Sequence, residues 1–117
     1  MAHAMGIANA ERSLSYMQTL AAFVSQPEIA PVVPMFGIVN EVLWGEIGEI
    51  PLKSFYAQAL KSIRETTGLG AGKGPYLAYH EGFQGASEFS GFLAGGDRLV
   101  LDMHPYMAFD PSAYTQT

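Results

Sequence analysis

The sequence predicts an α/β fold in which about three parallel strands alternate with helices. Short, nearly continuous apolar runs have the character of strands that are buried on both faces of a parallel sheet. Longer segments place apolar residues three or four positions apart, which is the spacing of one helical face. Because the two kinds of segment alternate along the chain, we expect right-handed βαβ units whose strands lie parallel in one sheet.

Two long segments are predicted to be helices. The first follows an N-cap at Asn9 and stops at Gln26-Pro27. Its apolar stripe comprises Ile7, Ala10, Leu14, Met17, Ala21 and Val24. The second opens with Pro51 at its first position and ends at Gly68. Its apolar face comprises Leu52, Tyr56, Ala59, Leu60 and Ile63. We expect both stripes to pack in the core.

The strands are predicted over residues 32–39, 76–79 and 98–101, with a short helix around 87–92 before the last one. A glycine-rich loop at 68–75 precedes the second strand. A phosphate-binding loop would need Ser or Thr after Lys73 and glycine at position 67, where Gly74 and Thr67 stand instead. We therefore interpret it as a helix C-cap and a connection.

Composition narrows the range of partners. The chain has 117 residues, which suits one domain, and a net charge of −5. Its six Lys and Arg residues are scattered and form no basic patch of the kind that binds nucleic acid. No run approaches the roughly 20 apolar residues of a membrane helix, and the first six residues do not resemble a signal peptide. A neutral ligand is favoured over a polyanion.

Polar side chains follow all three predicted strands. The first strand leads into Asn40-Glu41, the second into His80-Glu81, and the third into the segment 102–106, Asp-Met-His-Pro-Tyr. Parallel strands bring their carboxyl ends to one edge of the sheet, where α/β barrels build their active sites. We expect Glu41 to be catalytic and Asp102 to cap a backbone turn. His80 fits equally a structural and a functional role.

These segments resemble glycoside hydrolase family 5, in particular the fungal exo-β-1,3-glucanases. The likeness lies in residues 36–41 (Phe-Gly-Ile-Val-Asn-Glu), 64–75, 80–85 (His-Glu-Gly-Phe-Gln-Gly) and 101–109, which contains a His-x-Tyr pair. It extends from about Gly6 to Asp110. It implies a partial (β/α)8 TIM barrel, in which residues 1–117 form a fragment of a single catalytic domain, from before strand 4 to just after strand 6.

The resemblance also implies the roles of the site residues. Glu41 would be the general acid/base, and Asn40 would bind the 2-hydroxyl of the sugar that is cleaved. His104 and Tyr106 would line the same subsite, and Phe109 would stack on a sugar at the mouth of the cleft. The expected substrate is β-glucan or another neutral oligosaccharide, with no cofactor and no metal. The expected location is extracellular or associated with the cell wall.

The chain departs from the family pattern at two places. Val42 follows the Asn-Glu pair where the family often has Pro, which is a tolerable variation. Glu81-Gly82 stands where the family often has Asp-Ala, and this leaves the role of Glu81 open.

Retaining hydrolysis needs two carboxyl groups about 5–5.5 Å apart. The acid must stay protonated, so we expect burial and a nearby negative charge to raise the pKa of Glu41. In the family the nucleophile is a Glu at the end of the seventh strand, whereas the last Glu here is Glu88. We therefore expect a fragment that lacks the nucleophile, is inactive alone, and is poorly soluble because its sheet edges are open.

Two other functions stay open at this stage. A metal-dependent barrel hydrolase would use Glu41, His80 and His104, because His and carboxylate side chains bind zinc. A sugar-binding remnant without catalysis would keep the aromatic residues and need no nucleophile.

Overall fold

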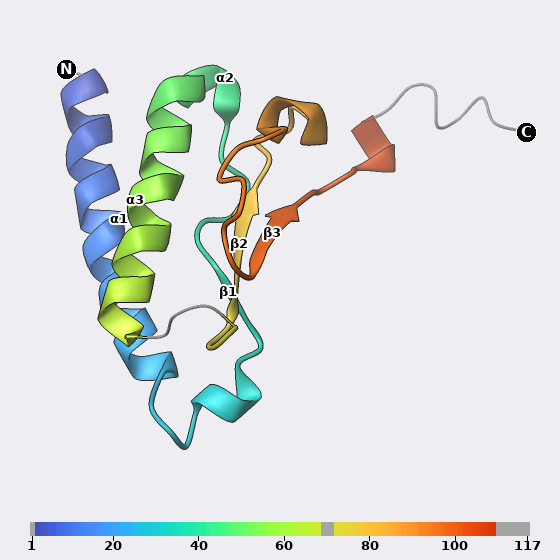
Figure 1. The fold of residues 1–117 in the computed structure, drawn as a ribbon. Coiled ribbons are helices and arrows are strands. Elements are labelled where there is room, and N and C mark those ends of the chain that lie inside the picture. Colours follow the sequence, from blue (N-terminus) through green and yellow to red (C-terminus); the bar gives the residue numbers. More distant parts are fainter. Residues whose placement is uncertain (1, 69–71, 110–117) are drawn as a thin grey trace, which may run out of the picture.

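The computed structural model describes residues 2–68 and 72–109 (Figure 1). Helix α1 (Ala2–Val24) is followed by a 3₁₀ turn η1 (Ala30–Val32) and strand β1 (Met35–Gly37). A one-turn helix α2 (Trp44–Ile47) leads into helix α3 (Glu49–Thr67) and strand β2 (Tyr76–His80). The turn η2 (Ala86–Phe89), strand β3 (Leu99–Asp102) and the turn η3 (Met107–Phe109) complete the order. The described residues contain no helix with the length and hydropathy of a membrane span.

The strands form one parallel sheet in the order β1-β2-β3, as the alternation of elements predicts. Phe36 lies opposite Leu77, and Tyr79 lies opposite Leu101. A hydrogen bond from Ile38 N to Ala78 O, 2.9 Å long, continues the pairing one residue beyond β1. The parallel arrangement confirms the expected α/β class and brings the carboxyl ends of the strands to one edge.

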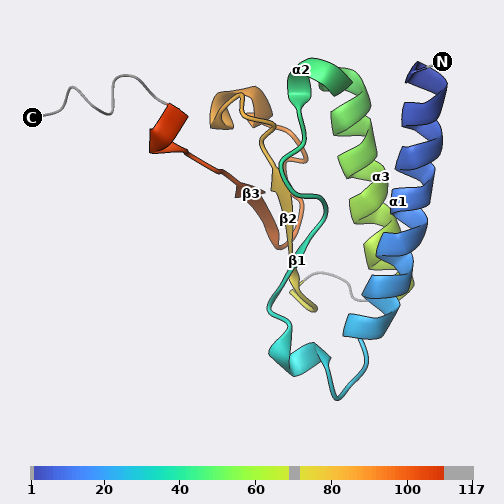
Figure 2. The ribbon, with the colours of Figure 1, turned by 180° about the vertical axis from the view of Figure 1, so that it is seen from behind.

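Helices α1 and α3 lie side by side on one face of this sheet, as the two opposite views agree (Figures 1 and 2). The core fills the space between α3 and the sheet, and α1 adds residues from its inner stripe. Its buried members include Met17, Ala21, Phe36, Leu52, Tyr56, Ala59, Leu60, Ile63, Leu77 and Tyr79. On the opposite face of the sheet, Met35 and Tyr76 are 49% and 45% exposed. The sheet is therefore covered by helices on one side only.

The predicted helical faces pack inward where they are described, but the start of each helix differs from the prediction. Helix α3 begins at Glu49, so Pro51 occupies its third position rather than its first. Every predicted residue of the α3 face is buried, and Gly68 ends the helix in the left-handed region with φ 63°. The predicted N-cap at Asn9 is wrong, because α1 already begins at Ala2. Alanine has the highest helix propensity, and alanines at positions 2, 4, 8 and 10 extend the helix toward the N-terminus. The side chain of Ile7 lies outside the described residues.

Strand β1 is shorter than predicted, because Val32 belongs to the turn η1, which contains Pro31, and Pro34 directly precedes the strand. Proline lacks a backbone N–H and therefore does not support a central strand. Strand β3 is only half-buried rather than buried, since it pairs with β2 alone among the described strands. The short helix that was expected around 87–92 is the 3₁₀ turn η2.

The described part of the glycine-rich loop is hydrogen-bonded to the residues that directly precede β3. Gly72 N donates to Asp97 Oδ2 at 2.7 Å, and the guanidinium of Arg98 donates to the carbonyl oxygens of Gly72 and Gly74 at 2.6 and 2.9 Å. These bonds agree with its interpretation as a connection. Residues 69–71 of the loop lie outside the described residues.

Candidate active site

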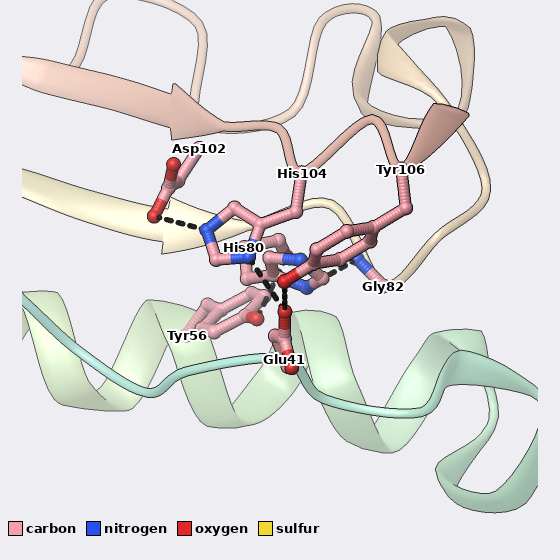
Figure 3. A network of polar contacts seen from close by, with 7 residues as sticks. All are labelled: Glu41, Tyr56, His80, Gly82, Asp102, His104 and Tyr106. Atoms are coloured by element: carbon pink, nitrogen blue, oxygen red, sulfur yellow. Dashed lines mark hydrogen bonds and ion pairs between the residues drawn. The ribbon is translucent and has the colours of Figure 1, made fainter. Parts of the chain in front are cut away.

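Side chains from the segments that follow all three strands line one open pocket of about 580 Å³. Glu41 comes from the segment after β1 and Phe83 from the segment after β2. His104, Tyr106 and Phe109 come from the segment after β3. Figure 3 shows Glu41, His104 and Tyr106 pointing toward one another. The parallel sheet thus brings together the residues that the sequence analysis placed at one edge.

One carboxylate oxygen, Oε1 of Glu41, makes both of the side-chain contacts at the centre of this site. The Nδ1 atom of His104 lies 3.0 Å from Glu41 Oε1. The phenol of Tyr106 donates a hydrogen bond to the same oxygen (Figure 3). Because both contacts end on Oε1, the second oxygen of Glu41 accepts no side-chain hydrogen bond from the described residues.

Asp102 belongs to this cluster, and its side chain accepts no backbone hydrogen bond from the described residues, contrary to the expected turn cap. Its Oδ2 atom lies 3.3 Å from His104 Nε2. The two residues are two positions apart at the end of β3, where extended backbone places their side chains on one side. The spacing Asp-x-His was the signal in the sequence that could have revealed this pair. His104 is therefore held between two carboxylates.

This arrangement stabilises charge on both partners of the central pair. Hydrogen bonds from His104 and then Tyr106 lower the pKa of Glu41 below its ordinary value, against a smaller opposing effect of burial. The hydrogen bond to Glu41 is the largest cause that raises the pKa of His104, and the bond to Asp102 adds to it. The same carboxylate raises the pKa of the Tyr106 phenol.

The expectation of a raised pKa for Glu41 is wrong for the described residues. The side chain of Glu41 is 34% exposed, so desolvation is weak, and its closest polar neighbours are hydrogen-bond donors rather than a second carboxylate. In this state Glu41 is an ionised base at neutral pH. To act as an acid it would have to lose these donors or gain a negative neighbour.

Two pocket residues adopt backbone conformations that side chains rarely take. Glu41 has φ 47° and Phe83 has φ 62°, both in the left-handed region. Residues held in such conformations cost about 1–3 kcal/mol each and cluster at functional sites. At Glu41 this backbone turn aims the carboxylate back toward the segment after β3 (Figure 3).

His80, the last residue of β2, lies beneath the pocket and is 1% exposed. Its Nδ1 atom accepts a hydrogen bond from Gly82 N at 3.0 Å, and its carbonyl oxygen accepts one from the Tyr56 phenol at 2.8 Å. Its ring lies edge-on to those of His104 and Phe83, with centroids 4.6 and 4.8 Å apart. His80 is thus packed from α3 on one side and from the pocket residues on the other.

The remaining predicted residues have different surroundings. Asn40 is exposed and does not line the pocket, whereas Phe109 lines it with 82% of its surface exposed. Glu81, whose role was left open, is 4% exposed and accepts a hydrogen bond from Gly85 N at 2.7 Å. It therefore closes the turn after β2. Phe83 was missed as a pocket residue, although its position directly after the polar end of a strand was a signal.

The described part of the chain contains no set of ligands for the metal ion that the alternative function would need. No three His, Asp or Glu side chains within residues 2–68 and 72–109 are placed to hold one ion. Both ring nitrogens of His104 face carboxylates, and Nδ1 of His80 accepts from Gly82. Ligation by either histidine at these atoms would have to break an existing contact.

The chain is similar to fungal β-glucan hydrolases over most of its length. It is 29% identical over 106 residues to the probable glucan 1,3-β-glucosidase D of Aspergillus flavus and 27% identical to that of Neosartorya fischeri. It is 23% identical over 102 residues to the glucan 1,3-β-glucosidase D of Emericella nidulans. These matches cover 86–90% of this chain but only 12% of each relative.

No protein-family model matches the chain, and no solved structure is significantly similar to it. The polar cluster at the carboxyl edge of a parallel sheet and the weak similarity to these enzymes agree with each other. Together they support a glycoside hydrolase-like relationship.

Proposed function

We propose that this chain carries the acid/base half of the active site of a retaining β-glucan hydrolase. The observation that carries the proposal is the convergence of Glu41, His104 and Tyr106 on one open pocket, built from the ends of parallel strands. The relatives are named as glucan 1,3-β-glucosidases, so a β-1,3-glucan is the proposed substrate class. A glucan agrees with the extracellular or wall-associated location that the resemblance implies.

In the proposed reaction Glu41 acts twice. Its protonated carboxyl first gives the proton to the glycosidic oxygen while a second carboxylate attacks the anomeric carbon, so that the C–O bond breaks and a glycosyl ester forms. The ionised Glu41 then takes a proton from water. The water oxygen attacks the same carbon, and the second carboxylate leaves. Asn40 is the proposed partner of the sugar 2-hydroxyl.

The rings of Phe83, Tyr106 and Phe109 suit a sugar ligand. Ring centroids of Tyr106 lie 6.4 Å from Phe83 and 5.9 Å from Phe109. Tyr106 and Phe109 are 49% and 82% exposed, and Phe83 is 42% exposed. Aromatic faces bury the apolar faces of sugar rings and exclude water around the carboxyl group. Phe109 is the proposed stacking residue at the mouth of the pocket.

The second carboxylate is proposed to come from polypeptide beyond these 117 residues. The chain corresponds to 12% of each relative, and its sheet is covered on one face only. A (β/α)8 barrel typically takes about 250 residues. In this proposal the chain is the part of such a barrel from before strand 4 to just after strand 6.

The first test uses the purified 117-residue chain and a laminarin-type glucan. We expect no release of reducing sugar, because the nucleophile is missing from the described cluster. Clear turnover by the chain alone would contradict the proposal that the second carboxylate comes from other polypeptide. It would show that a carboxylate of this chain supplies the nucleophile.

The second test uses the complete gene product that contains this chain and the variant Glu41→Ala. Loss of a general acid typically costs about 10²–10⁴-fold in rate, and we expect a loss in this range on glucan. A nitrophenyl β-glucoside needs no protonation of its leaving group, so the variant should still form the glycosyl ester. Added azide should then attack that ester and give a β-glycosyl azide.

The matched control is Glu46→Gln, which alters an exposed carboxylate of α2 outside the pocket. It should leave glucan hydrolysis unchanged and give no azide product. If Glu41→Ala keeps full activity, or if azide produces no glycosyl azide, Glu41 is not the acid/base.

A second candidate function is sugar binding without catalysis. The observation that favours it is that the closest polar neighbours of Glu41 are the hydrogen-bond donors His104 and Tyr106, which lower the pKa of its carboxyl and so disfavour the protonated form that an acid needs. This reading expects laminari-oligosaccharides to perturb the signals of Tyr106 and Phe109 in spectra of the chain. It also expects the complete gene product to hydrolyse none of them.

A further inference from the structure

We infer that His80 is a positioning residue whose Nε2–H serves as a hydrogen-bond donor to the free carboxylate oxygen of Glu41. The inference rests on the proposed function only in so far as Glu41 is the acid/base. The hydrogen bond itself can be tested without turnover. His80 lies at the end of the central strand, between α3 and the pocket (Figure 3).

The hydrogen bond from Gly82 fixes the state of the His80 ring. Because Gly82 N–H donates to Nδ1 at 3.0 Å, Nδ1 presents a lone pair and carries no hydrogen. The ring hydrogen therefore resides on Nε2. The backbone of the turn after β2 thus selects one neutral tautomer and keeps a donor on the far side of the ring.

That donor is buried without a partner. His80 is 1% exposed, and its Nε2 is the buried side-chain polar atom without a hydrogen bond within the described residues. Most buried polar groups in folded proteins have a partner, and an unmade bond costs free energy. An acceptor that reaches Nε2 would therefore stabilise the site.

Glu41 is the acceptor that the surroundings offer. Its two side-chain hydrogen bonds both end on Oε1, so Oε2 has acceptor capacity left. His80 lies in edge contact with His104, which is itself 3.0 Å from Glu41. The Glu41 side chain is 34% exposed and held by one oxygen, so it is free to rotate, and the inferred hydrogen bond requires a rotation that brings Oε2 to the His80 ring.

The other groups that face His80 do not compete for Nε2. The phenol of Tyr56 on α3 already donates its hydrogen bond to the His80 carbonyl oxygen. Glu81 accepts from Gly85 N, and Asp102 faces His104 Nε2. The Phe83 ring is apolar. Glu81 and Asp102 each have one oxygen engaged in these contacts, whereas Glu41 is the carboxylate that lines the pocket and whose Oε2 accepts no hydrogen bond from a described side chain.

The bond would give Glu41 a second orientation that the chain adopts without a ligand. In the first, seen in the structure, His104 and Tyr106 hold Oε1. In the second, His80 also holds Oε2, so loss of this donor changes the pKa of Glu41 in the free chain. A donor to the charged form lowers the pKa of a carboxyl group, so His80 would keep Glu41 in place for the step in which it acts as a base.

Two substitutions test the roles of the two ring nitrogen atoms of His80 separately. In His80→Asn, the amide oxygen can replace Nδ1 as the acceptor for Gly82, but no donor reaches the position of Nε2. In His80→Gln, the longer amide can place a donor near Nε2 while the acceptor for Gly82 is lost. We expect His80→Asn to raise the pKa of Glu41 and His80→Gln to leave it near that of the unaltered chain.

The pKa of Glu41 is measured by ¹³C NMR titration of the full chain labelled at the glutamate carboxyl carbons. Urea unfolding of each variant verifies that it is folded. In addition, ¹⁵N spectra of the unaltered chain report the tautomer directly, with hydrogen expected on Nε2. Hydrogen on Nδ1 of His80 overturns the inference, and this readout does not depend on the folding of any variant.

The two variants give four outcomes for the pKa of Glu41. A rise in His80→Asn alone supports the donor role. A rise in both variants, in neither, or in His80→Gln alone overturns it; the last result assigns His80 to the Gly82 turn. A water molecule as the partner of Nε2 would appear as no rise in either variant.

Kinetics of the complete gene product separate this inference from the proposed function. If both hold, His80→Asn lowers kcat roughly 10-fold or more, as misplacement of a catalytic group can, with little change in KM, and His80→Gln restores it. If the NMR result holds but no glucan is hydrolysed by any of the proteins, the proposed function fails and the positioning role of His80 stands.

Discussion

At the scale of single residues, the site depends on which donors reach the carboxylate of Glu41. His104 is held between Glu41 and Asp102, so both ring nitrogens face negative charge. Tyr106 adds a phenol donor to the same oxygen of Glu41. These contacts lower the pKa of the Glu41 carboxyl and raise the pKa of the His104 imidazole. They also predict how the site responds to pH.

The Glu41–His104 pair should contribute to stability within a limited pH range. The pKa of His104 is raised above 6.5, so its contribution is complete below pH 6.5 and is lost as the pH rises through the raised value. The pKa of Glu41 is lowered below 4.5, so its contribution is complete above pH 4.5 and is lost as the pH falls through the lowered value. The full effect lies between these limits.

We therefore expect the difference in unfolding free energy between the unaltered chain and His104→Ala to be largest between pH 4.5 and 6.5 and to shrink on both sides. Urea unfolding at a series of pH values measures it. The control Asn40→Ala removes a neighbouring side chain that does not titrate, and its effect should not vary with pH. A constant difference for His104→Ala would contradict the pairing.

Tyr56→Phe should destabilise the fold by about 1–3 kcal/mol, the usual cost of an unmade buried hydrogen bond. Tyr56 is fully buried, and its phenol donates to the His80 carbonyl oxygen at 2.8 Å. Burial is the main cause that raises the pKa of this phenol, so it stays protonated. The matched control is Tyr16→Phe at a position 61% exposed, where we expect less than about 0.5 kcal/mol. Equal effects in urea unfolding would show that the buried bond contributes nothing.

At the scale of elements, the turn after β2 is fitted to the one-turn helix α2. Gly82 has φ 71°, and a Cβ atom built on it would lie 2.9 Å from the Cβ of Trp44. The Trp44 ring lies edge-on to Phe89 of η2, with centroids 5.5 Å apart. Glycine at position 82 lets the Trp44 side chain approach the backbone that carries His80 and Phe83. This contact gives a packing reason for Gly82, where the glucanase motif often has Ala.

Gly82→Ala should therefore lower the free energy of unfolding by more than the cost of placing alanine in the left-handed region. A non-glycine residue in that region costs about 1–2 kcal/mol, and the contact with Trp44 adds to it. Gly95 is the matched control, because it has φ 80° with no atom within 4 Å of an added Cβ. Gly95→Ala should show the backbone cost only. If urea unfolding gives the same loss for both, Trp44 does not constrain the turn.

At the scale of the whole molecule, the described part of the sheet has two edges without a partner strand and one face without a helix. Strands β1 and β3 each pair with β2 alone among the described strands. Met35 on β1 and Tyr76 on β2 are 49% and 45% exposed, and Val32 before β1 is 76% exposed. Unpaired edges and apolar surface favour association with other chains.

We expect the isolated chain to self-associate through this uncovered region. Met35→Lys places a charge on an edge strand and should shift the chain toward monomer, as measured by sedimentation velocity over a concentration series. The control Ile50→Lys changes a hydrophobic residue that is 82% exposed on α3, away from the strands, and should have little effect. A chain that is monomeric at all concentrations, or an equal shift for both variants, would contradict the role of the edge.

The sequence by itself determined the order of elements, the inward face of α3 and the end of that helix. These features depend on local patterns, namely apolar spacing at Leu52, Tyr56 and Ile63 and the left-handed freedom of Gly68. The sequence also identified Glu41, His104 and Tyr106, because parallel strands bring their carboxyl ends to one edge. It could not fix the start of α1, since Asn9 suits both a cap and a helix interior.

Only the tertiary structure decided what these residues do to one another. It brought His104 and Tyr106 to the same oxygen of Glu41 and left Nε2 of His80 buried beneath the pocket. It also lowered the pKa of Glu41 where the sequence suggested a rise. Proximity between residues 24 and 63 positions apart sets hydrogen bonds, burial and pKa, and no local pattern in the chain encodes the distances on which these depend.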